Sequence, residues 1–128
     1  MSVQFNESDL ENFTGTMQYY RSSLLFPDIV HTDGVQFVAE RGGAWMLDVI
    51  VSHQIKSAVH DQEFQVWEFL VKEDGKCQVI CSDGETEAHL TKQDIPYTDL
   101  PFDMKFFLQL GSLDLITPAW VIMLPNEY

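Results

Sequence analysis

The sequence predicts an α+β fold in which one long helix packs against an antiparallel sheet. Three observations lead to this class. Residues 43–60 carry apolar side chains at helical spacing, and residues 63–92 hold two Asp-Gly turn signals nine positions apart. Residues 119–124 form a separate β-rich run. The chain has 128 residues, close to the usual size of one domain, so we expect a single domain over 1–128.

The N-terminal segment predicts a short helix. Ser8 and Glu11 stand at capping-box spacing, with Leu10 and Phe13 as apolar anchors, so the helix should occupy about residues 6–12 and end near Gly15. Residues 19–26 fit either a strand or an irregular packed segment, and Pro27 ends them.

Glycine-rich turns divide the next stretch. The run from His31 to Gly34 predicts a turn, with Gly34 at the position that needs a positive φ. Residues 35–40 then form a short apolar-polar run that ends at Arg41-Gly42-Gly43. The paired glycines predict a corner between a strand and the following helix.

The helix expected over about 43–60 should be largely enclosed, because apolar residues cover most of its surface. Those on its main apolar face are Ala44, Leu47, Val51, Ile55 and Ala58. The narrow opposite stripe consists of Asp48, Ser52, Lys56 and Val59.

The segment 63–92 predicts a three-stranded antiparallel meander. Trp67, Phe69 and Val71 alternate onto one face of its first strand. Asp74-Gly75 and Asp83-Gly84 are the two hairpin turns. Beyond a loop over 95–102, residues 103–110 fit a strand or a short helix, and residues 119–124 should close the sheet.

Charge is the unusual feature of the composition. Twenty Asp and Glu oppose seven Lys and Arg, for a formal net charge of −13. Such a chain repels nucleic acid and anionic membranes, so we expect no direct nucleic-acid partner and no membrane partner. A basic protein surface is the partner that this charge favours. The alternative is that the acidity serves solubility alone.

The cysteine spacing predicts two free thiols. Cys77 and Cys81 lie four apart in an expected strand, which separates them by roughly 13 Å, whereas a disulfide needs Cα atoms within about 7 Å. Three features of the sequence favour a cytoplasmic location. The thiols are free, the N-terminus lacks the basic-then-apolar order of a signal peptide, and no apolar run reaches about 20 residues.

The sequence predicts no catalytic residues, no metal site and no cofactor. His53 and His60 are two helical turns apart, about 10 Å, which is too far for a single zinc ion without a third element. Ser52 and His53 are adjacent and point in different directions on a helix. Asp48 could orient His53, which leaves a small hydrolase or transferase using Asp48, His53 and also His31 as an alternative.

The candidate binding residues are acids expected at the helix end and at the hairpin turns. They are Asp61, Glu63, Glu73, Asp74, Asp83, Glu85 and Glu87. The 73–75 turn should lie at one end of the meander, and the 61–63 and 83–85 segments at the other. A helix C-terminus disfavours anions, so acids gathered there suggest a partner. A solvated, aggregation-resistant sheet edge is the alternative interpretation.

Four segments carry a resemblance to a known family. The run from His31 to Asp48, the triplet Ser52-His53-Gln54, the run from Phe64 to Trp67 and the run from Leu124 to Tyr128 resemble a family of small uncharacterised bacterial and phage proteins. That family is a domain of unknown function found on mobile elements. The resemblance implies a phage, plasmid or integrated-element setting, in which small acidic proteins often antagonise host defences, as anti-CRISPR proteins do.

These observations predict a small acidic inhibitor in the host cytosol that blocks a basic, nucleic-acid-binding surface of a larger complex, such as a CRISPR effector complex. Exposed aromatics such as Tyr97 or Tyr128 would anchor the contact. A further alternative is a regulatory homodimer formed through an edge strand such as 119–124.

Overall fold

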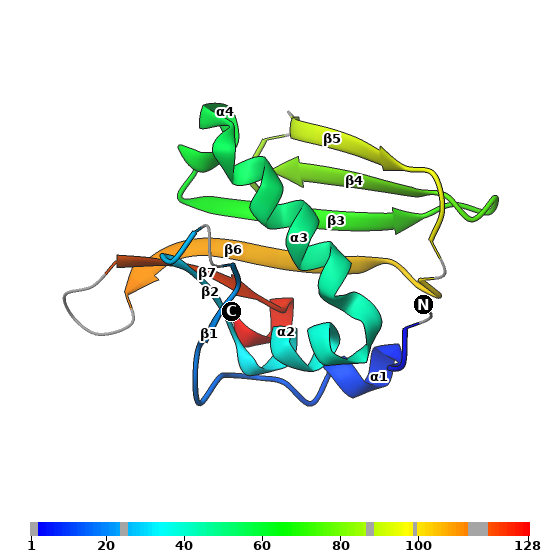
Figure 1. Cartoon of the computed structure of the whole chain (residues 1–128), viewed down its shortest axis with the longest axis horizontal. Helices are drawn as coiled ribbons and strands as arrows, with labels where there is room; N and C mark the ends of the chain where they lie inside the picture. The colour runs from blue at the N-terminus through cyan, green and yellow to red at the C-terminus, as the bar shows by residue number, and fades with distance from the viewer. Residues whose placement is uncertain (1–2, 24–25, 87–88, 99, 113–117) are drawn as a thin grey trace.

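The computed structural model describes residues 3–23, 26–86, 89–98, 100–112 and 118–128, and it confirms the α+β class. A seven-stranded mixed sheet, in the order β1-β2-β7-β6-β3-β4-β5, carries the main helical segment on one face (Figure 1). The strands are β1 (Tyr20–Arg21), β2 (Ile29–His31), β3 (Phe64–Val71), β4 (Cys77–Ser82), β5 (His89–Ile95), β6 (Met104–Ser112) and β7 (Pro118–Met123).

The N-terminal helix forms, but with a different cap from the predicted one. Helix α1 (Glu7–Leu10) begins after Asn6, whose side chain accepts a hydrogen bond from the Asp9 amide at 3.0 Å. The Asp9 carboxylate in turn accepts a hydrogen bond from the Asn6 amide at 3.0 Å. The capping box thus uses Asn6 and Asp9 in place of Ser8 and Glu11, because Asn and Asp cap a helix as well as Ser does.

The main helix does not occupy 43–60 as predicted. It begins as α2 (Asp33–Val38), turns through the kinked η1 (Ala39–Gly43), and continues as α3 (Ala44–Ser52) and η2 (His53–Ile55). The predicted turn at 31–34 and the run 35–40 are therefore the end of a strand and the start of this helix. The kink lies at Gly42, whose φ is 95°, so the paired glycines join two helices and not a strand to a helix.

The C-terminal part of the predicted helix is interrupted at Lys56, whose ψ of 125° is extended. A separate turn, α4 (Ser57–His60), follows. The break resets the helical phase, and two residues of the prediction are corrected here. Val59 of the predicted polar stripe is fully buried, whereas Ile55 of the predicted apolar face is 76% exposed.

The meander is confirmed, with β3, β4 and β5 paired in succession. Gly75 and Gly84 both adopt φ of 81° in the two turns, as the Asp-Gly signals predict. The third strand starts at His89 and not near Glu85. Residues 104–112 form a strand, β6, which settles the choice between strand and helix. The sequence between 19 and 26 contributes the short strand β1.

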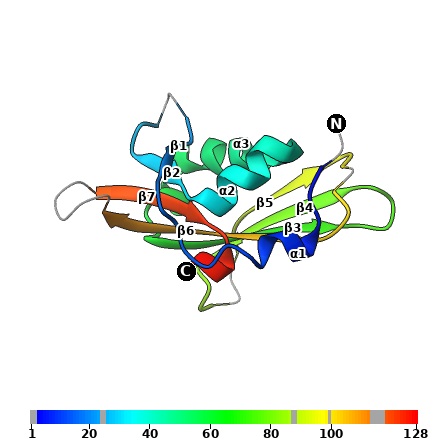
Figure 2. The ribbon, with the colours of Figure 1, turned by 90° about the horizontal axis from the view of Figure 1, so that it is seen from below.

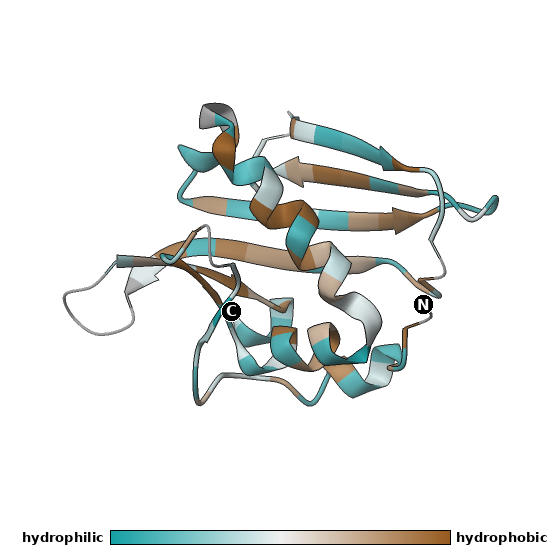
Figure 3. Cartoon of the chain, viewed as in Figure 1, coloured by the Kyte–Doolittle hydropathy of each residue, from teal (hydrophilic) through white to brown (hydrophobic). Residues whose placement is uncertain are grey.

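Two predictions about the sheet are wrong. The sheet is mixed and not purely antiparallel, because β2 runs parallel to β7. β7 is also an interior strand, since it pairs with β2 on one side and β6 on the other. A homodimer through residues 119–124 would need a free edge that β7 does not have. Within the described strands the edges are β1 and β5, and β5 is coloured hydrophilic along most of its length (Figure 3).

The main core lies between the sheet and the helices. Trp67 and Phe69 of β3 and Phe106 of β6 face α3 and are completely buried there, and burying each such side chain contributes about 1.5–3 kcal/mol. We call this side of the sheet the covered face and the opposite side the open face. Figure 2 shows α2 and α3 on the covered face, and the short η3 (Pro125–Glu127) on the open face.

Candidate binding surface

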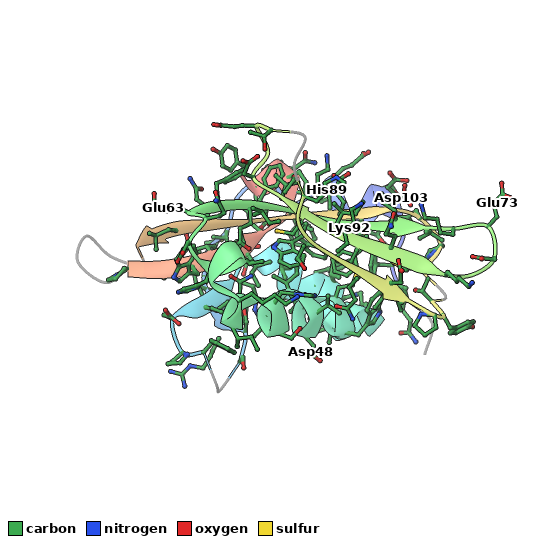
Figure 4. All side chains as sticks on the ribbon, turned by 90° about the horizontal axis from the view of Figure 1, so that it is seen from above. Asp48, Glu63, Glu73, His89, Lys92 and Asp103 are labelled. Carbon is green, nitrogen blue, oxygen red and sulfur yellow. The ribbon has the colours of Figure 1, made fainter. Side chains whose placement is uncertain are left out.

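The predicted acidic residues fall at two opposite ends of the meander. Glu73 and Asp74 occupy the β3–β4 turn, whereas Glu63 stands at the start of β3, at the far end of the sheet (Figure 4). Asp61 precedes Glu63, and the turn with Asp83 and Glu85 follows β4 at that same end. Glu87 lies outside the described residues. The set is therefore not one cluster, as the expected meander geometry already implied.

The turn after β4 folds over the open face. A Cβ atom added to Gly84 would lie 3.1 Å from Val66 Cγ2 and 3.2 Å from Phe64 Cε2, so the backbone passes directly above these two side chains. The Asp83 carboxylate accepts hydrogen bonds from the amides of Thr86 and Glu85, at 2.8 and 2.9 Å. Those bonds lower the pKa of Asp83. Asp83 thus shapes the turn, and Glu85 projects from it exposed.

Three aromatic side chains meet on the open face beside this turn. The rings of Phe64, Phe107 and Tyr128 lie 5.2–5.5 Å apart in every pairing. Tyr128 is 68% exposed, whereas the two phenylalanines are half-buried. We call these three residues the aromatic patch. The sequence singled out Tyr128 as an exposed aromatic, but the ring contacts depend on β3, β6 and η3 meeting in three dimensions.

Glu127 holds the C-terminal turn in place. Its Oε1 accepts a hydrogen bond from the Thr32 hydroxyl at 2.6 Å, and its Oε2 accepts one from the Gly34 amide at 3.1 Å. Oε1 also accepts a bond from the Leu124 amide at 3.0 Å. A Cβ atom on Gly34 would come within 2.7 Å of Glu127 Oε1, so Gly34 provides space and not the positive φ that we predicted.

A hollow of about 220 Å³ adjoins the same turn. Its walls come from α1, from the segment that enters β6 and from η3. Apolar side chains form its base, and carboxylates stand at its rim: the lining residues are Glu7, Leu10, Glu11, Phe102, Asp103, Met104, Lys105, Leu124, Pro125 and Asn126. The sequence offered no sign of this hollow, because three distant segments build it.

A second hollow, of about 380 Å³, lies beside the β3–β4 turn of the meander. Lys72, Lys76 and Asp94 are its charged lining residues. Lys76 pairs with Asp74 at 3.6 Å, between two exposed side chains. This hollow is therefore of mixed charge, in contrast to the acidic rim near η3.

The predicted Asp48–His53 pair does not form. Residues five apart on a helix lie about 140° apart around its axis, so the two side chains leave opposite sides. Asp48 is exposed on the side of α3 that faces away from the sheet (Figure 4). His53 is buried against the Trp67 ring, and its Nε2 lies 2.7 Å from Gln93 Oε1.

His31 is the centre of a polar chain on the covered face. Its Nε2 lies 2.6 Å from Gln36 Oε1, and the Gln36 amide donates onward to Glu40 at 2.9 Å. This direction places the ring proton on Nε2, so His31 Nδ1 accepts the Ser22 hydroxyl at 2.7 Å. Burial lowers the pKa of His31 and outweighs the Gln36 bond, which raises it, so the imidazole is neutral near pH 7.

Metal ligands do not gather in the described part of the chain: no group of three or more His, Cys, Asp or Glu side chains there has the geometry to hold an ion. Cys77 and Cys81 are free thiols, as predicted, and both are buried. Burial raises the pKa of Cys81 to about 12, so this thiol is a packing group and not a nucleophile. None of the described helices combines the length and apolarity that a membrane crossing needs.

Comparison with protein families gives a match over nearly the whole chain. The profile of DUF6876, described as a family of unknown function, matches residues 4–128, nearly the whole chain. Neither the curated proteins nor the solved structures contain a significant match.

Proposed function

We propose that this chain, which belongs to the DUF6876 family, is a small acidic binding protein that covers a basic, nucleic-acid-binding surface of a larger complex. The observation that carries the proposal is the aromatic patch, where exposed Tyr128 stands at the end of the sheet that also bears Glu63 and Glu85. An aromatic anchor with charged neighbours is the arrangement that gives most protein interfaces their binding energy and their orientation.

The carboxylates are available for such a contact because few of them meet a cation. Among the described residues there are two ion pairs, Arg41–Glu40 at 3.8 Å and Lys76–Asp74 at 3.6 Å. Neither involves an acid near the aromatic patch. With a net charge of −13, the surface keeps a negative field that accelerates association with a basic partner and weakens as salt is added.

The class of partner rests on charge and on the resemblance to mobile-element proteins. A protein surface that binds nucleic acid is basic by necessity, and an acidic protein can occupy it in place of the phosphate backbone. In a phage or plasmid setting, a CRISPR effector or another defence complex in the host cytosol fits this description. The chain would then be an anti-CRISPR or related anti-defence inhibitor.

A competition experiment tests the proposal. The immobilised protein captures complexes from the lysate of a bacterium with a CRISPR system, and each captured complex is purified and assayed for target DNA binding. We expect the added protein to displace DNA and its own binding to weaken steeply between 50 and about 300 mM salt. A captured complex that binds DNA equally well with and without the protein contradicts the proposal.

A matched pair of variants locates the contact. Tyr128→Ala combined with Glu63→Gln and Glu85→Gln should weaken binding by about tenfold or more, since an interfacial tyrosine alone is often worth that much. The control combines Tyr97→Ala with Asp28→Asn and Asp48→Asn, which changes charge and exposed aromatic area equally elsewhere. If the control loses binding and the first variant does not, the aromatic patch is not the interface.

A second candidate function is hydrolysis, favoured by the Ser22–His31 hydrogen bond of 2.7 Å. A neutral imidazole held by Gln36 can accept the serine proton as a general base. A fluorophosphonate probe tests it: Ser22 Oγ would bond to phosphorus, its proton would pass to His31 Nδ1, and fluoride would leave. Labelling that disappears in Ser22→Ala but persists in Ser52→Ala supports this activity. If the probe does not label the protein, the hydrogen bond between Ser22 and His31 has a structural role and not a catalytic one.

A further inference from the structure

The hollow beside η3 combines an apolar base with an acidic rim. Its volume of about 220 Å³ is below the roughly 300 Å³ at which sites for whole small molecules begin, so it suits one inserted side chain. We propose that it receives an arginine side chain of the protein partner. This inference deepens the proposed function and rests on it for the existence of that partner.

The base of the hollow suits the aliphatic part of an arginine. Met104 and Leu124 are 3% and 2% exposed, and Leu10 is half-buried against the same core. Phe102, half-buried at the wall, is fixed by an edge contact with Phe5 at 5.8 Å. A guanidinium group is weakly hydrated and stacks on aromatic rings, whereas an ammonium group holds its water more tightly.

The rim supplies acceptors for the charged end. Glu7 and Glu11 are exposed and four residues apart, so both project from the same side of α1, where their mutual repulsion is unfavourable. The Asp103 carboxylate is held by a hydrogen bond from the Val71 amide at 2.8 Å. Three carboxylates against the single cation Lys105 leave the rim negative, and an inserted cation would relieve that excess.

Arginine fits this arrangement better than lysine. Its five N–H donors form a planar fork that can bond to carboxylates on separate elements at the same time. A lysine ammonium is a compact charge that would reach fewer of them. Surfaces that bind nucleic acid are rich in arginine, so the partner class already proposed supplies the residue.

The hollow and the aromatic patch share the C-terminal segment of the chain. Leu124, Pro125 and Asn126 line the hollow, and the same segment ends at Tyr128 on the patch. In Figure 2, α1 and the red turn η3 both lie below the sheet, and residues from both segments line the hollow. One partner surface could therefore place an arginine in the hollow while it covers Tyr128.

A side-chain mimic tests the site without the partner. The full-length, methyl-labelled protein is titrated with n-butylguanidinium at constant ionic strength, and its NMR methyl signals are followed. We expect saturable shifts centred on Leu10, Met104 and Leu124, with binding about fivefold tighter than that of n-butylammonium and no shifts with neutral n-butylurea. Equal binding of the ammonium probe, or shifts spread over the surface, overturns the proposal.

Variants separate the rim from general electrostatics. Glu7→Gln with Glu11→Gln should weaken n-butylguanidinium binding by about fivefold, whereas Asp28→Asn with Asp48→Asn, two exposed acids elsewhere, should leave it unchanged. Equal effects of the two pairs would overturn the assignment. Because this probe needs no partner, the arginine site can be disproved while partner capture through the aromatic patch still succeeds. The two proposals are therefore tested separately.

Discussion

The Glu127 carboxylate accepts a hydrogen bond from the Thr32 hydroxyl at 2.6 Å, across 95 positions of the chain. Thr32 is the residue that caps α2, so this bond joins the C-terminal turn to the start of the main helix. The turn carries Tyr128 and lines the hollow. One short polar contact thus positions both parts of the proposed interface.

The first prediction concerns this contact. Glu127→Ala removes the acceptor for Thr32, Gly34 and Leu124 and leaves buried or half-buried donors unpaired, which should cost about 1–3 kcal/mol of unfolding free energy. Urea unfolding measures this loss. Glu73→Ala, an exposed acid in the β3–β4 turn, serves as the control and should change stability by less than about 0.5 kcal/mol. Equal stability of the two variants would contradict the anchoring role.

The second prediction concerns Gly43, which packs against Val38 of α2 where the kinked η1 meets α3. A Cβ atom at Gly43 would clash with Val38 Cγ1 and would lie 2.8 Å from the Val38 carbonyl oxygen. Gly43→Ala should therefore destabilise the protein by about 1–3 kcal/mol through overpacking. Gly15→Ala meets no atom within 4 Å and should be nearly neutral in the same thermal or urea measurement. A neutral Gly43→Ala would mean that the helices separate easily at the kink.

The third prediction concerns alkaline pH. Burial raises the pKa of Cys81 from 9.0 to about 12, so the folded state resists ionisation of this thiol. A raised folded-state pKa contributes stability that is present below pH 9 and is lost as pH rises toward about 12. Unfolding free energies measured from pH 8 to about 11 should fall more steeply for the native chain than for Cys81→Ala. Parallel curves would show that Cys81 ionises equally in both states.

The fourth prediction concerns acid. Burial lowers the pKa of His31 below its usual 6.5, so the unfolded chain takes up this proton more readily than the folded one. The stability that His31 contributes is present above about pH 6.5 and is lost as pH falls through the lower folded-state value. His31→Gln, which keeps a polar group, should flatten the pH dependence of urea unfolding between about pH 7 and 5. An unchanged slope would contradict a neutral, buried His31.

Sequence alone determined the local features of this protein. Alternation and Asp-Gly turns specify the β3–β4–β5 meander, because a period of two and a positive φ are encoded by neighbouring residues. The two thiols and the exposure of Tyr97 and Tyr128 were likewise predictable from spacing and composition.

The helix boundaries were harder to derive from the pattern. An apolar period continues across a kink or a break, so the pattern did not reveal that the helix starts at Asp33, bends at Gly42 and is interrupted at Lys56. The kink and the break depend on tertiary packing, namely the close contact of Gly43 with Val38 and the burial of Val59 in the core.

Tertiary structure alone decided the candidate site. The parallel pairing of β2 with β7 makes β7 an interior strand and brings the C-terminal turn beside Thr32. The aromatic patch and the acidic hollow each draw on segments far apart in the chain, and no local pattern records which segments will meet. The sequence determined how much negative charge this protein carries. The fold decided which carboxylates surround an apolar surface, because only long-range packing places them together.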